Sequence, residues 1–413
     1  MINIKLISTK ENHMPTIEAN VEGKSLYLYS KYNPKRDSQA FAEAAYEKGV
    51  NNYLIYGLGL GYHINSLVKL IGNEDYHIYV FECNEDILKL EHESITDLKG
   101  NNNITVVGID STNSFFHELR KALSIDNIKL VVHNPSLQII PEKYRDLRYL
   151  LEEFIINKES MESIADSLDN NFNENINNFD LYVDELFDKY VNKALFIVSA
   201  GPSLDKNIGD LSKKQNGGII LSVGRAAKGL VAAGITPNYI ILTDPSKHLF
   251  NSQLKGLDVN VPIIVLSTAD KNIMKNYKGT KYIALQKGYE LAEKYAKKND
   301  NTLVRTGGSV ATTALDIGIK MGCNPIVFVG QDLGFTDNRS HSGMARSRNI
   351  VQSGGLRDIE DIYGNTIQTS KNLYIYLRWI QNRIAEEKDI EFIDATEGGA
   401  RIRGTKVMKL KDV

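Results

Sequence analysis

The chain has 413 residues, of which 42% are hydrophobic and 24% are charged, values typical of a globular protein. Its formal net charge of −2 argues against a protein that binds duplex nucleic acid, which would carry a strong basic excess. Two cysteines, Cys83 and Cys323, are too few for a disulfide framework, so buried reduced thiols are expected. The amino terminus lacks the apolar core of a signal peptide, and no apolar run reaches the roughly 20 residues of a membrane span. We therefore expect a cytoplasmic protein of two domains, with neither nucleic acid nor a membrane as partner.

Residues 1–150 predict a Rossmann-like α/β domain. An expected strand at 53–56 enters the glycine-rich turn GLGLG at 57–61, and a helix follows. Further strands are expected at 76–84, 103–110 and 128–135. Glu82 stands about 25 residues after the turn, as in domains that bind a dinucleotide or S-adenosylmethionine. A tight turn in a domain without a cofactor explains the pattern equally well, so both interpretations stay open.

Residues 151–192 predict a helical linker, because the segment lacks Gly and Pro and its apolar residues recur at steps of three and four. Residues 193–413 predict a second doubly wound α/β domain. Its strands are near-continuous apolar runs, as expected where helices cover both faces of a parallel sheet. The expected strands are 194–200, 217–224, 238–245, 261–268, 281–285 and 325–332. The same domain should contain a helix at 308–322, a hairpin turning at Gly364-Asn365 and an amphipathic helix at 371–388.

Small and polar residues follow the apolar strands of this second domain. Ligands of open parallel sheets bind beyond the carboxyl ends of the strands, so residues at that edge are candidates for a site. They are Gly201, Pro202, Ser203, Gly224, Arg225, Thr243, Asp244, Ser267, Thr268, Gln331 and Asp332, with Thr306, Gly307, Gly308 and Ser309 at a helix start. Caps and turns would explain one such end, but several on one edge are better explained by a binding site.

Two of these corners, the turns GPS at 201–203 and TGGS at 306–309, are expected to leave backbone N–H groups bare at the start of a helix. Such donors and the helix dipole suit a phosphate, so the pair of corners predicts a nucleotide site. No GxxxxGK[ST] string occurs, and an ordinary P-loop ATPase is therefore not expected.

A polar segment after Asp332 is expected to cover the site. It contains His341, the one histidine placed to act as an acid or base near neutral pH. It also contains arginines that could bind a carboxylate or phosphate, namely Arg339, Arg346 and Arg348. A solvated charged loop with a surface histidine is the alternative. No cluster with metal-ligand spacing occurs, so no metal is expected, although Asp244 and Asp332 could share a hydrated Mg²⁺.

Four separated motifs resemble the motility associated factor (Maf) family of bacterial flagellin glycosyltransferases. They are SAGPSLDKNI at 199–208, AAGITPNYIILTDP at 232–245, the run from TGGSVATTALDIGIKMG to SHSGM at 306–344, and DATEGGARIRGT at 394–405. The resemblance implies a sialyltransferase-like second domain. It also implies transfer of a nonulosonic acid, such as pseudaminic or legionaminic acid, from its CMP-activated form to Ser or Thr of flagellin, for flagellar assembly and motility.

The same resemblance implies which residues hold the donor. In bacterial sialyltransferases a GPSL turn and a helix start hold the nucleotide, so Gly201, Pro202, Ser203 and Leu204, with Thr306 to Ser309, would line the CMP pocket. Ala200 stands where those enzymes have Asn, so the contacts differ in detail. Gly224, Arg225, Asp244 and Gln331 complete the expected nucleotide site. Loop arginines would meet the sugar carboxylate, and His341 or Asp332 would act as base, with no cofactor required.

Two other functions stay open. The GPSL and GQDL pattern is shared with an archaeal 6-hydroxymethylpterin diphosphokinase (MptE-like), which transfers diphosphate from ATP. A non-catalytic flagellin-binding protein with the same fold is the third hypothesis.

Overall fold

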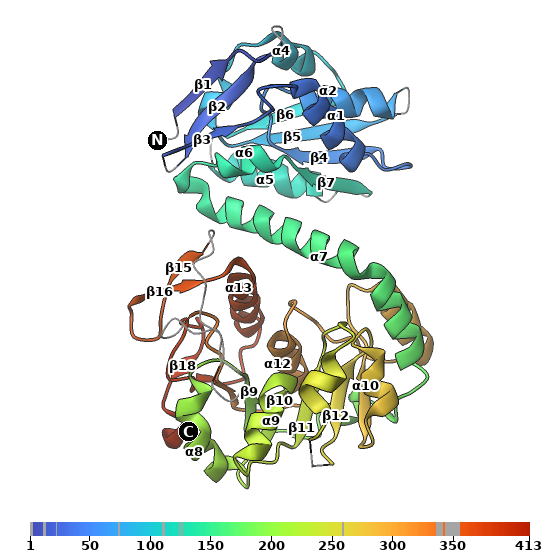
Figure 1. The fold of residues 1–413 in the computed structure, drawn as a ribbon, viewed down its shortest axis with the longest axis vertical. Helices are drawn as coiled ribbons and strands as arrows, with labels where there is room; N and C mark the ends of the chain where they lie inside the picture. The colour runs from blue at the N-terminus through green and yellow to red at the C-terminus, as the bar shows by residue number, and fades with distance from the viewer. Residues whose placement is uncertain are drawn as a thin grey trace. The chain divides into compact units, whose positions relative to one another are not determined.

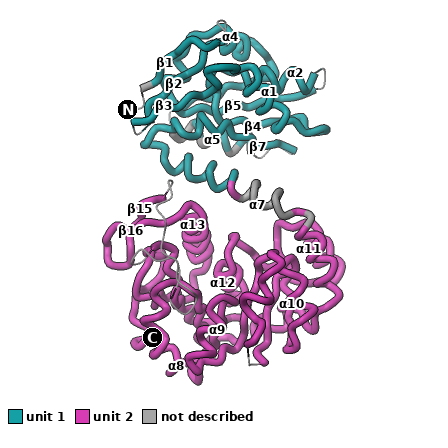
Figure 2. The backbone as a smooth tube through the Cα atoms, viewed as in Figure 1, with its two compact units in different colours: residues 1–155 teal, residues 156–413 magenta. Residues whose placement is uncertain are grey.

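A computed structural model describes residues 3–10, 14–21, 23–72, 75–109, 112–123, 125, 127–257, 260–335, 342 and 356–413. The chain divides into two compact units, residues 1–155 and 156–413 (Figure 2). The long helix α7 (Arg145–Asn175) begins in the first unit and ends in the second (Figure 1). Each unit is described by itself below.

The first unit contains a parallel sheet with strand order β6-β5-β4-β7. Its strands are β4 (Asn52–Tyr56), β5 (His77–Glu82), β6 (Ile104–Gly108) and β7 (Ile128–Val132). A separate antiparallel sheet contains β1 (Asn3–Ile7), β2 (Thr16–Val21) and β3 (Lys24–Tyr27). The helices are α1 (Pro34–Ala45), α2 (Tyr62–Ile71), α3 (Glu85–Leu88), α4 (Glu93–Lys99), α5 (Thr112–Leu123) and α6 (Asn134–Gln138). The predicted Rossmann-like alternation of strands and helices is confirmed.

The second unit is built on a nine-stranded parallel sheet with the order β18-β17-β14-β9-β10-β11-β12-β13-β8. The strands are β8 (Leu181–Tyr182), β9 (Leu195–Val198), β10 (Ile219–Val223), β11 (Tyr239–Leu242), β12 (Ile263–Leu266), β13 (Lys281–Ala284), β14 (Ile326–Val329), β17 (Phe392–Asp394) and β18 (Lys406–Val407). Every residue of β9, β11, β12 and β14 is buried, which explains why their sequences are unbroken apolar runs. All six predicted strands are present.

Helices follow most strands of this sheet (Figure 1). They are α8 (Leu204–Lys214), α9 (Gly224–Ala232), a π-helix (Phe250–Leu254), α10 (Lys271–Asn276), α11 (Glu290–Asn299), α12 (Val310–Lys320) and α13 (Lys371–Ala385). The predicted hairpin is formed by β15 (Arg357–Glu360) and β16 (Thr366–Thr369). Short 3₁₀ turns lie at Glu142–Tyr144, Val183–Leu186 and Leu410–Asp412. Cys83 and Cys323 are buried free thiols, as expected.

The helical prediction for 176–192 is wrong, because α7 ends at Asn175. Directly after that end, the side-chain amides of Asn177 and Asn178 donate hydrogen bonds to main-chain carbonyls of the last helical turn. Leu181 and Tyr182 then pair with β13 as the edge strand β8. Strand pairing, a non-local interaction, here overrides a local helical pattern.

The order of the strands creates a switch point between β14 and β9. From β9 the chain adds β10, β11, β12 and β13 on one side, and it returns only later to place β14 on the other side. Connections that leave neighbouring strands in opposite directions open a crevice at the carboxyl ends of those strands, where ligands bind in such folds.

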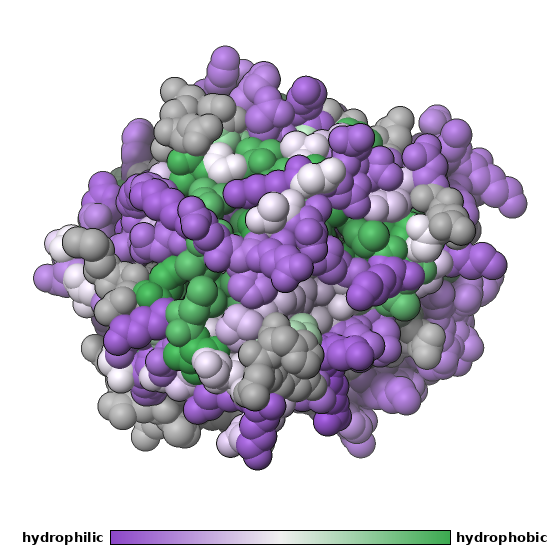
Figure 3. Space-filling view, turned by 90° about the horizontal axis from the view of Figure 1, so that it is seen from above, coloured by the Kyte–Doolittle hydropathy of each residue, from purple (hydrophilic) through white to green (hydrophobic). Residues whose placement is uncertain are grey.

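On the face shown in Figure 3, hydrophilic side chains divide the hydrophobic surface into small areas. Among the described residues, no helix combines the length and the apolar character needed to cross a bilayer.

Candidate functional site

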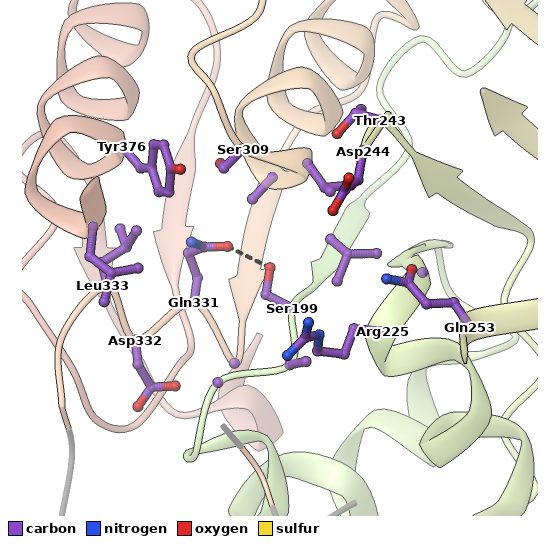
Figure 4. Close-up of a pocket in the computed structure, with 18 of the residues that line it drawn as sticks. Ser199, Arg225, Thr243, Asp244, Gln253, Ser309, Gln331, Asp332, Leu333 and Tyr376 are labelled. Atoms are coloured by element: carbon purple, nitrogen blue, oxygen red, sulfur yellow. Dashed lines mark hydrogen bonds between the residues drawn. The ribbon is translucent and has the colours of Figure 1, made fainter. Parts of the chain in front are cut away.

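A pocket of about 260 Å³ opens at the switch point of the second unit (Figure 4). Its walls come from the carboxyl ends of β9, β10, β11 and β14 and from α12 and α13. Nine residues that the sequence predicted for a site line it together: Gly201, Pro202, Gly224, Arg225, Thr243, Asp244, Ser309, Gln331 and Asp332. The two corners on which the nucleotide prediction depended therefore reach one pocket, through Gly201 and Pro202 on one side and Ser309 on the other.

The GPS turn does not present bare amides, contrary to expectation. The N–H of Gly201 donates to the carbonyl of Gly330 at 2.9 Å. Ser203 donates from its N–H (3.2 Å) and from its hydroxyl (2.7 Å) to Oδ2 of Asp332. Ser203 and Leu204 are fully buried and do not line the pocket. A carboxylate of the protein thus occupies the start of α8, where a phosphate was expected.

Packing within the fold also explains why the TGGS turn contains two glycines. A Cβ at Gly307 would overlap the ring of Trp379, and one at Gly308 would lie 3.1 Å from the ring of Tyr376. The N–H of Gly307 donates to the hydroxyl of Thr312 at 2.9 Å. Thr306, Gly307 and Gly308 are not among the residues that line the pocket. These glycines make room for aromatic side chains of α13 rather than for a ligand.

The start of α12 is the part of this corner that keeps donors for a ligand. Ser309 caps the helix in a capping box with Thr312. Val310 and Ala311 follow in the first turn, where backbone N–H groups have no acceptor within the helix, and both residues line the pocket. Arg225, exposed at the opposite wall, adds a positive charge. The helix dipole and the guanidinium together favour an anionic ligand group.

Gln331 and Asp332 leave β14 in different directions. The Ser199 hydroxyl donates to Oε1 of Gln331 at 2.5 Å, and this bond directs the amide NH₂ of Gln331 away from Ser199 (Figure 4). The Asp332 carboxylate lies apart from the other labelled side chains in the same view, because it is held by Ser203. Gln331 therefore offers donors to a ligand, while Asp332 stabilises the turn.

Asp244 stands at the end of β11 and faces Tyr376 of α13 across the pocket (Figure 4). One carboxylate oxygen, Oδ1, accepts the N–H of Ser246 at 2.8 Å. Burial and the negative charge of Asp244 raise the pKa of Tyr376, so this hydroxyl keeps its proton. Tyr376 escaped the sequence analysis because its helix has the aromatic and aliphatic spacing of a core helix. Ser199, Gln253 and Leu373 are further lining residues that were not proposed as site residues.

The polar end of β12 serves a different purpose from the one expected. Ser267 and Thr268 are buried and do not line the pocket. The Ser267 hydroxyl donates to Gln286 at 2.6 Å, and Gln286 donates to the Thr268 hydroxyl at 2.8 Å. The main-chain carbonyl of Ser267 accepts a hydrogen bond from Asn175 of α7, and that of Thr268 accepts one from Asn171. This strand end holds α7 on the sheet.

The loop residues His341, Arg339, Arg346 and Arg348 lie outside the described residues, so their expected roles stay predictions. The spacing of the sheet does not favour one Mg²⁺ held by both Asp244 and Asp332. Their strands are three places apart, which separates their backbones by about 14 Å. In the described ranges, no group of three or more His, Cys, Asp or Glu side chains could hold a metal ion.

The glycine-rich turn of the first unit is filled by side chains of the protein. Oε2 of Glu82 accepts the N–H of Leu58 at 3.0 Å, and the hydroxyl of Tyr29 accepts the N–H of Leu60 at 3.2 Å. Glu82 is fully buried, and burial raises its pKa to about 7. A Cβ at Gly59 would lie 2.6 Å from the Tyr29 hydroxyl. Of the two interpretations left open, these contacts favour the tight turn without a cofactor.

Comparison with known proteins agrees with the resemblance predicted from the motifs. Residues 169–338 match the family model described as 6-hydroxymethylpterin diphosphokinase MptE-like. The structure is similar to that of a Maf glycosyltransferase from Magnetospirillum magneticum AMB-1, with a TM-score of 0.55 and 14% sequence identity. The match covers 99% of this chain and 71% of that chain. No curated protein sequence matches this chain significantly. The match to the MptE-like family model and the structural similarity to a Maf glycosyltransferase confirm the predicted resemblance to these proteins.

Proposed function

We propose that this protein is a glycosyltransferase that moves a nonulosonic acid from a CMP-activated donor to Ser or Thr of flagellin in the cytoplasm. The observation that carries the proposal is the pocket at the switch point. It combines the first-turn amides of α12, which have no acceptor within the helix, with the Arg225 guanidinium, a pairing suited to a phosphate. The fold shared with a Maf glycosyltransferase supports the same class of reaction.

In this proposal the donor phosphate binds at Val310 and Ala311, and the amide NH₂ of Gln331 contacts the nucleoside. The Arg339, Arg346 and Arg348 side chains meet the sugar carboxylate. The reaction needs a stabilised phosphate leaving group and an oxocarbenium-like sugar, which donors and cations provide without a covalent nucleophile. No cofactor is required for this chemistry.

The match to the MptE-like model favours a second candidate, an ATP-dependent diphosphotransferase. Calorimetric titration with CMP, and in parallel with ATP and Mg²⁺, separates the two functions. Binding of CMP, weakened at least tenfold in Arg225→Ala, is the expected result. Binding of ATP·Mg²⁺ without binding of CMP would reject the glycosyltransferase and support the alternative.

Mass spectrometry of flagellin from cells with and without the gene tests the acceptor. A flagellin mass that drops by one or more nonulosonic acid residues in the deletion strain is expected. Full modification by a variant that no longer turns over donor would instead support a non-catalytic flagellin-binding protein.

A further inference from the structure

The described lining of the pocket contains few groups that can accept a proton. Among the described residues that line it, the ionisable side chains are Arg225, Asp244, Asp332 and Tyr376. An arginine stays protonated in proteins, and Tyr376 keeps its proton because its pKa is raised. If the proton acceptor is one of the described lining residues, it must therefore be Asp244 or Asp332.

Asp332 is committed to the fold. Its Oδ2 accepts both the N–H and the hydroxyl of Ser203, and the residue is 3% exposed. A proton accepted there would disrupt the buried start of α8, and the carboxylate lies apart from the other side chains of the pocket (Figure 4).

Asp244 has the opposite setting. The residue is exposed, and its carboxylate is directed into the pocket (Figure 4). Oδ1 is fixed by the N–H of Ser246, whereas Oδ2 has no hydrogen-bond partner within the part of the chain that the structure describes. One oxygen therefore orients the group and the other is available to a substrate hydroxyl.

The backbone around Asp244 is held by two neighbouring elements. The carbonyl of Asp244 accepts the N–H of Asp270 at 3.0 Å. Asn171 of α7 donates from Nδ2 to the carbonyls of Pro245 and Thr268, both at 3.1 Å. Asn175, one helical turn further along α7, donates from Nδ2 to the carbonyls of Ser267 and Ala269 instead.

We propose that Asp244 is the catalytic proton acceptor of this pocket and that Asn171 is a positioning residue for it. The inference rests on the proposed glycosyl transfer. The acceptor hydroxyl oxygen bonds to the anomeric carbon of the sugar, the bond from that carbon to the phosphate oxygen breaks, and its electron pair leaves with CMP. The hydroxyl proton passes to Oδ2 of Asp244 and from there to solvent.

The test measures sugar transfer from CMP-pseudaminic and CMP-legionaminic acid to unmodified flagellin by the full-length protein. Asp244→Asn should lower the transfer rate at least about 100-fold and leave the Kd for CMP within about threefold. Asp210→Asn, which changes a carboxylate paired with Lys213 on α8, is the control and should match the wild type. An unchanged rate in Asp244→Asn overturns the proposal, as does a loss confined to His341→Ala. CMP binding weakened as much as the rate also overturns it, because Asp244 would then be a binding residue.

Asn171 and Asn175 form a matched pair for the positioning role. Each donates two hydrogen bonds that hold α7 on the sheet, but one bond of Asn171 goes to Pro245, next to Asp244, whereas those of Asn175 go to Ser267 and Ala269. Asn171→Ala should lower kcat about tenfold with little change in KM, whereas Asn175→Ala should lower stability similarly and leave kcat unchanged. Equal kcat losses in the two variants, or none in Asn171→Ala, would overturn this role.

The outcomes separate this inference from the proposed function. If the wild-type protein uses ATP instead of a CMP-sugar, the proposed donor is wrong, but the role of Asp244 as proton acceptor is not yet contradicted. Asp244→Asn is then compared in diphosphate transfer, where a hydroxyl proton must also be accepted, and an unchanged rate overturns the inference. A wild type without turnover on either donor overturns both.

Discussion

Ser203 donates two hydrogen bonds, from its main-chain N–H and its hydroxyl, to the same Oδ2 of Asp332. Both residues are buried, and they come from sequence positions 129 residues apart. The contact joins the end of β14 to the start of α8 and explains why the chain turns so sharply at GPS. Asp332 therefore shapes the pocket by stabilising the GPS turn, whose Gly201 and Pro202 line the pocket.

Asp332→Ala should therefore act first on stability. Removing the acceptor leaves the Ser203 donors buried and unpaired, at a cost of about 1–3 kcal/mol in the free energy of unfolding. Urea denaturation measures the loss, with Asp210→Asn as the control that should change little. A variant that folds as stably as the wild type but no longer transfers sugar would make Asp332 the base instead.

Gly307→Ala should be destabilising because the new methyl group overlaps the ring of Trp379. Overpacking of this kind costs about 1–3 kcal/mol. A double-mutant cycle with Trp379→Leu checks the cause, since the smaller side chain should remove much of the penalty of Gly307→Ala. Additive effects in the cycle, together with a loss of CMP binding in Gly307→Ala alone, would place a ligand at this glycine after all.

The ion pair of Asp316 and Arg383 should contribute strongly to the stability of the second unit. Nε of Arg383 donates to Oδ1 of Asp316 at 2.9 Å, and the two side chains are 7% and 0% exposed, respectively. Oδ2 of Asp316 accepts the N–H of Arg305 at 2.8 Å. Asp316→Ala leaves the buried Nε of Arg383 and the N–H of Arg305 without their acceptor, although the guanidinium keeps its ion pairs with Glu386 and Glu387. The loss should be about 1–3 kcal/mol in the free energy of unfolding.

The matched control for this pair is Glu290, which forms an exposed pair with Lys294 on α11. Glu290→Ala should change the unfolding free energy by less than about 1 kcal/mol. Similar losses in Asp316→Ala and Glu290→Ala by thermal or urea unfolding would contradict the importance of burial.

The stacked rings of His63 and His133 should make the first unit sensitive to acid. Their centroids are 4.2 Å apart, and burial lowers the pKa of His63 to about 4 and the pKa of His133 well below its usual value of 6.5. The unfolded state therefore binds more protons than the folded state below pH 6.5. The free energy of unfolding should fall as the pH drops from 6.5 towards 4.

Glu82 acts in the opposite direction. Its pKa rises from 4.5 to about 7 on folding, so its contribution is present below pH 4.5 and is lost as the pH rises to about 7. Two histidines outweigh one carboxyl, so the net effect of acidification from pH 6.5 to 4.5 is a loss of stability of the first unit. Hydrogen exchange of peptides from β4 and α2 between pH 4.5 and 6.5, with β9 and β10 as the internal reference, measures it. Constant protection of β4 and α2 would contradict the prediction.

Much of the fold followed from local patterns in the sequence. The runs at 195–198, 239–242 and 263–266 are apolar at every position because both faces of the sheet are covered. The hairpin at 357–369 was evident from its Gly364-Asn365 turn. The strand at 181–182 was missed because it forms by pairing with β13, about 100 residues away.

The site was harder to predict because similar residue types serve both ligands and the fold. Gly201 and Ser309 line the pocket, whereas Gly307 is small because Trp379 packs on it. Asp244 and Asp332 both follow a buried strand, yet one faces the pocket and the other holds Ser203. No local feature distinguishes these cases.

The sequence by itself determined the α/β class, the strands and the sheet edge that carries the polar residues. Strands that are buried on both faces consist almost entirely of apolar residues, so they are visible in the sequence. Only the tertiary structure decided which of those residues meet in one pocket and which are used by the protein's own backbone. The reason is that hydrogen-bond partners such as Asp332 for Ser203, or Asn171 for Pro245, come from distant parts of the chain, where folding alone brings them within reach.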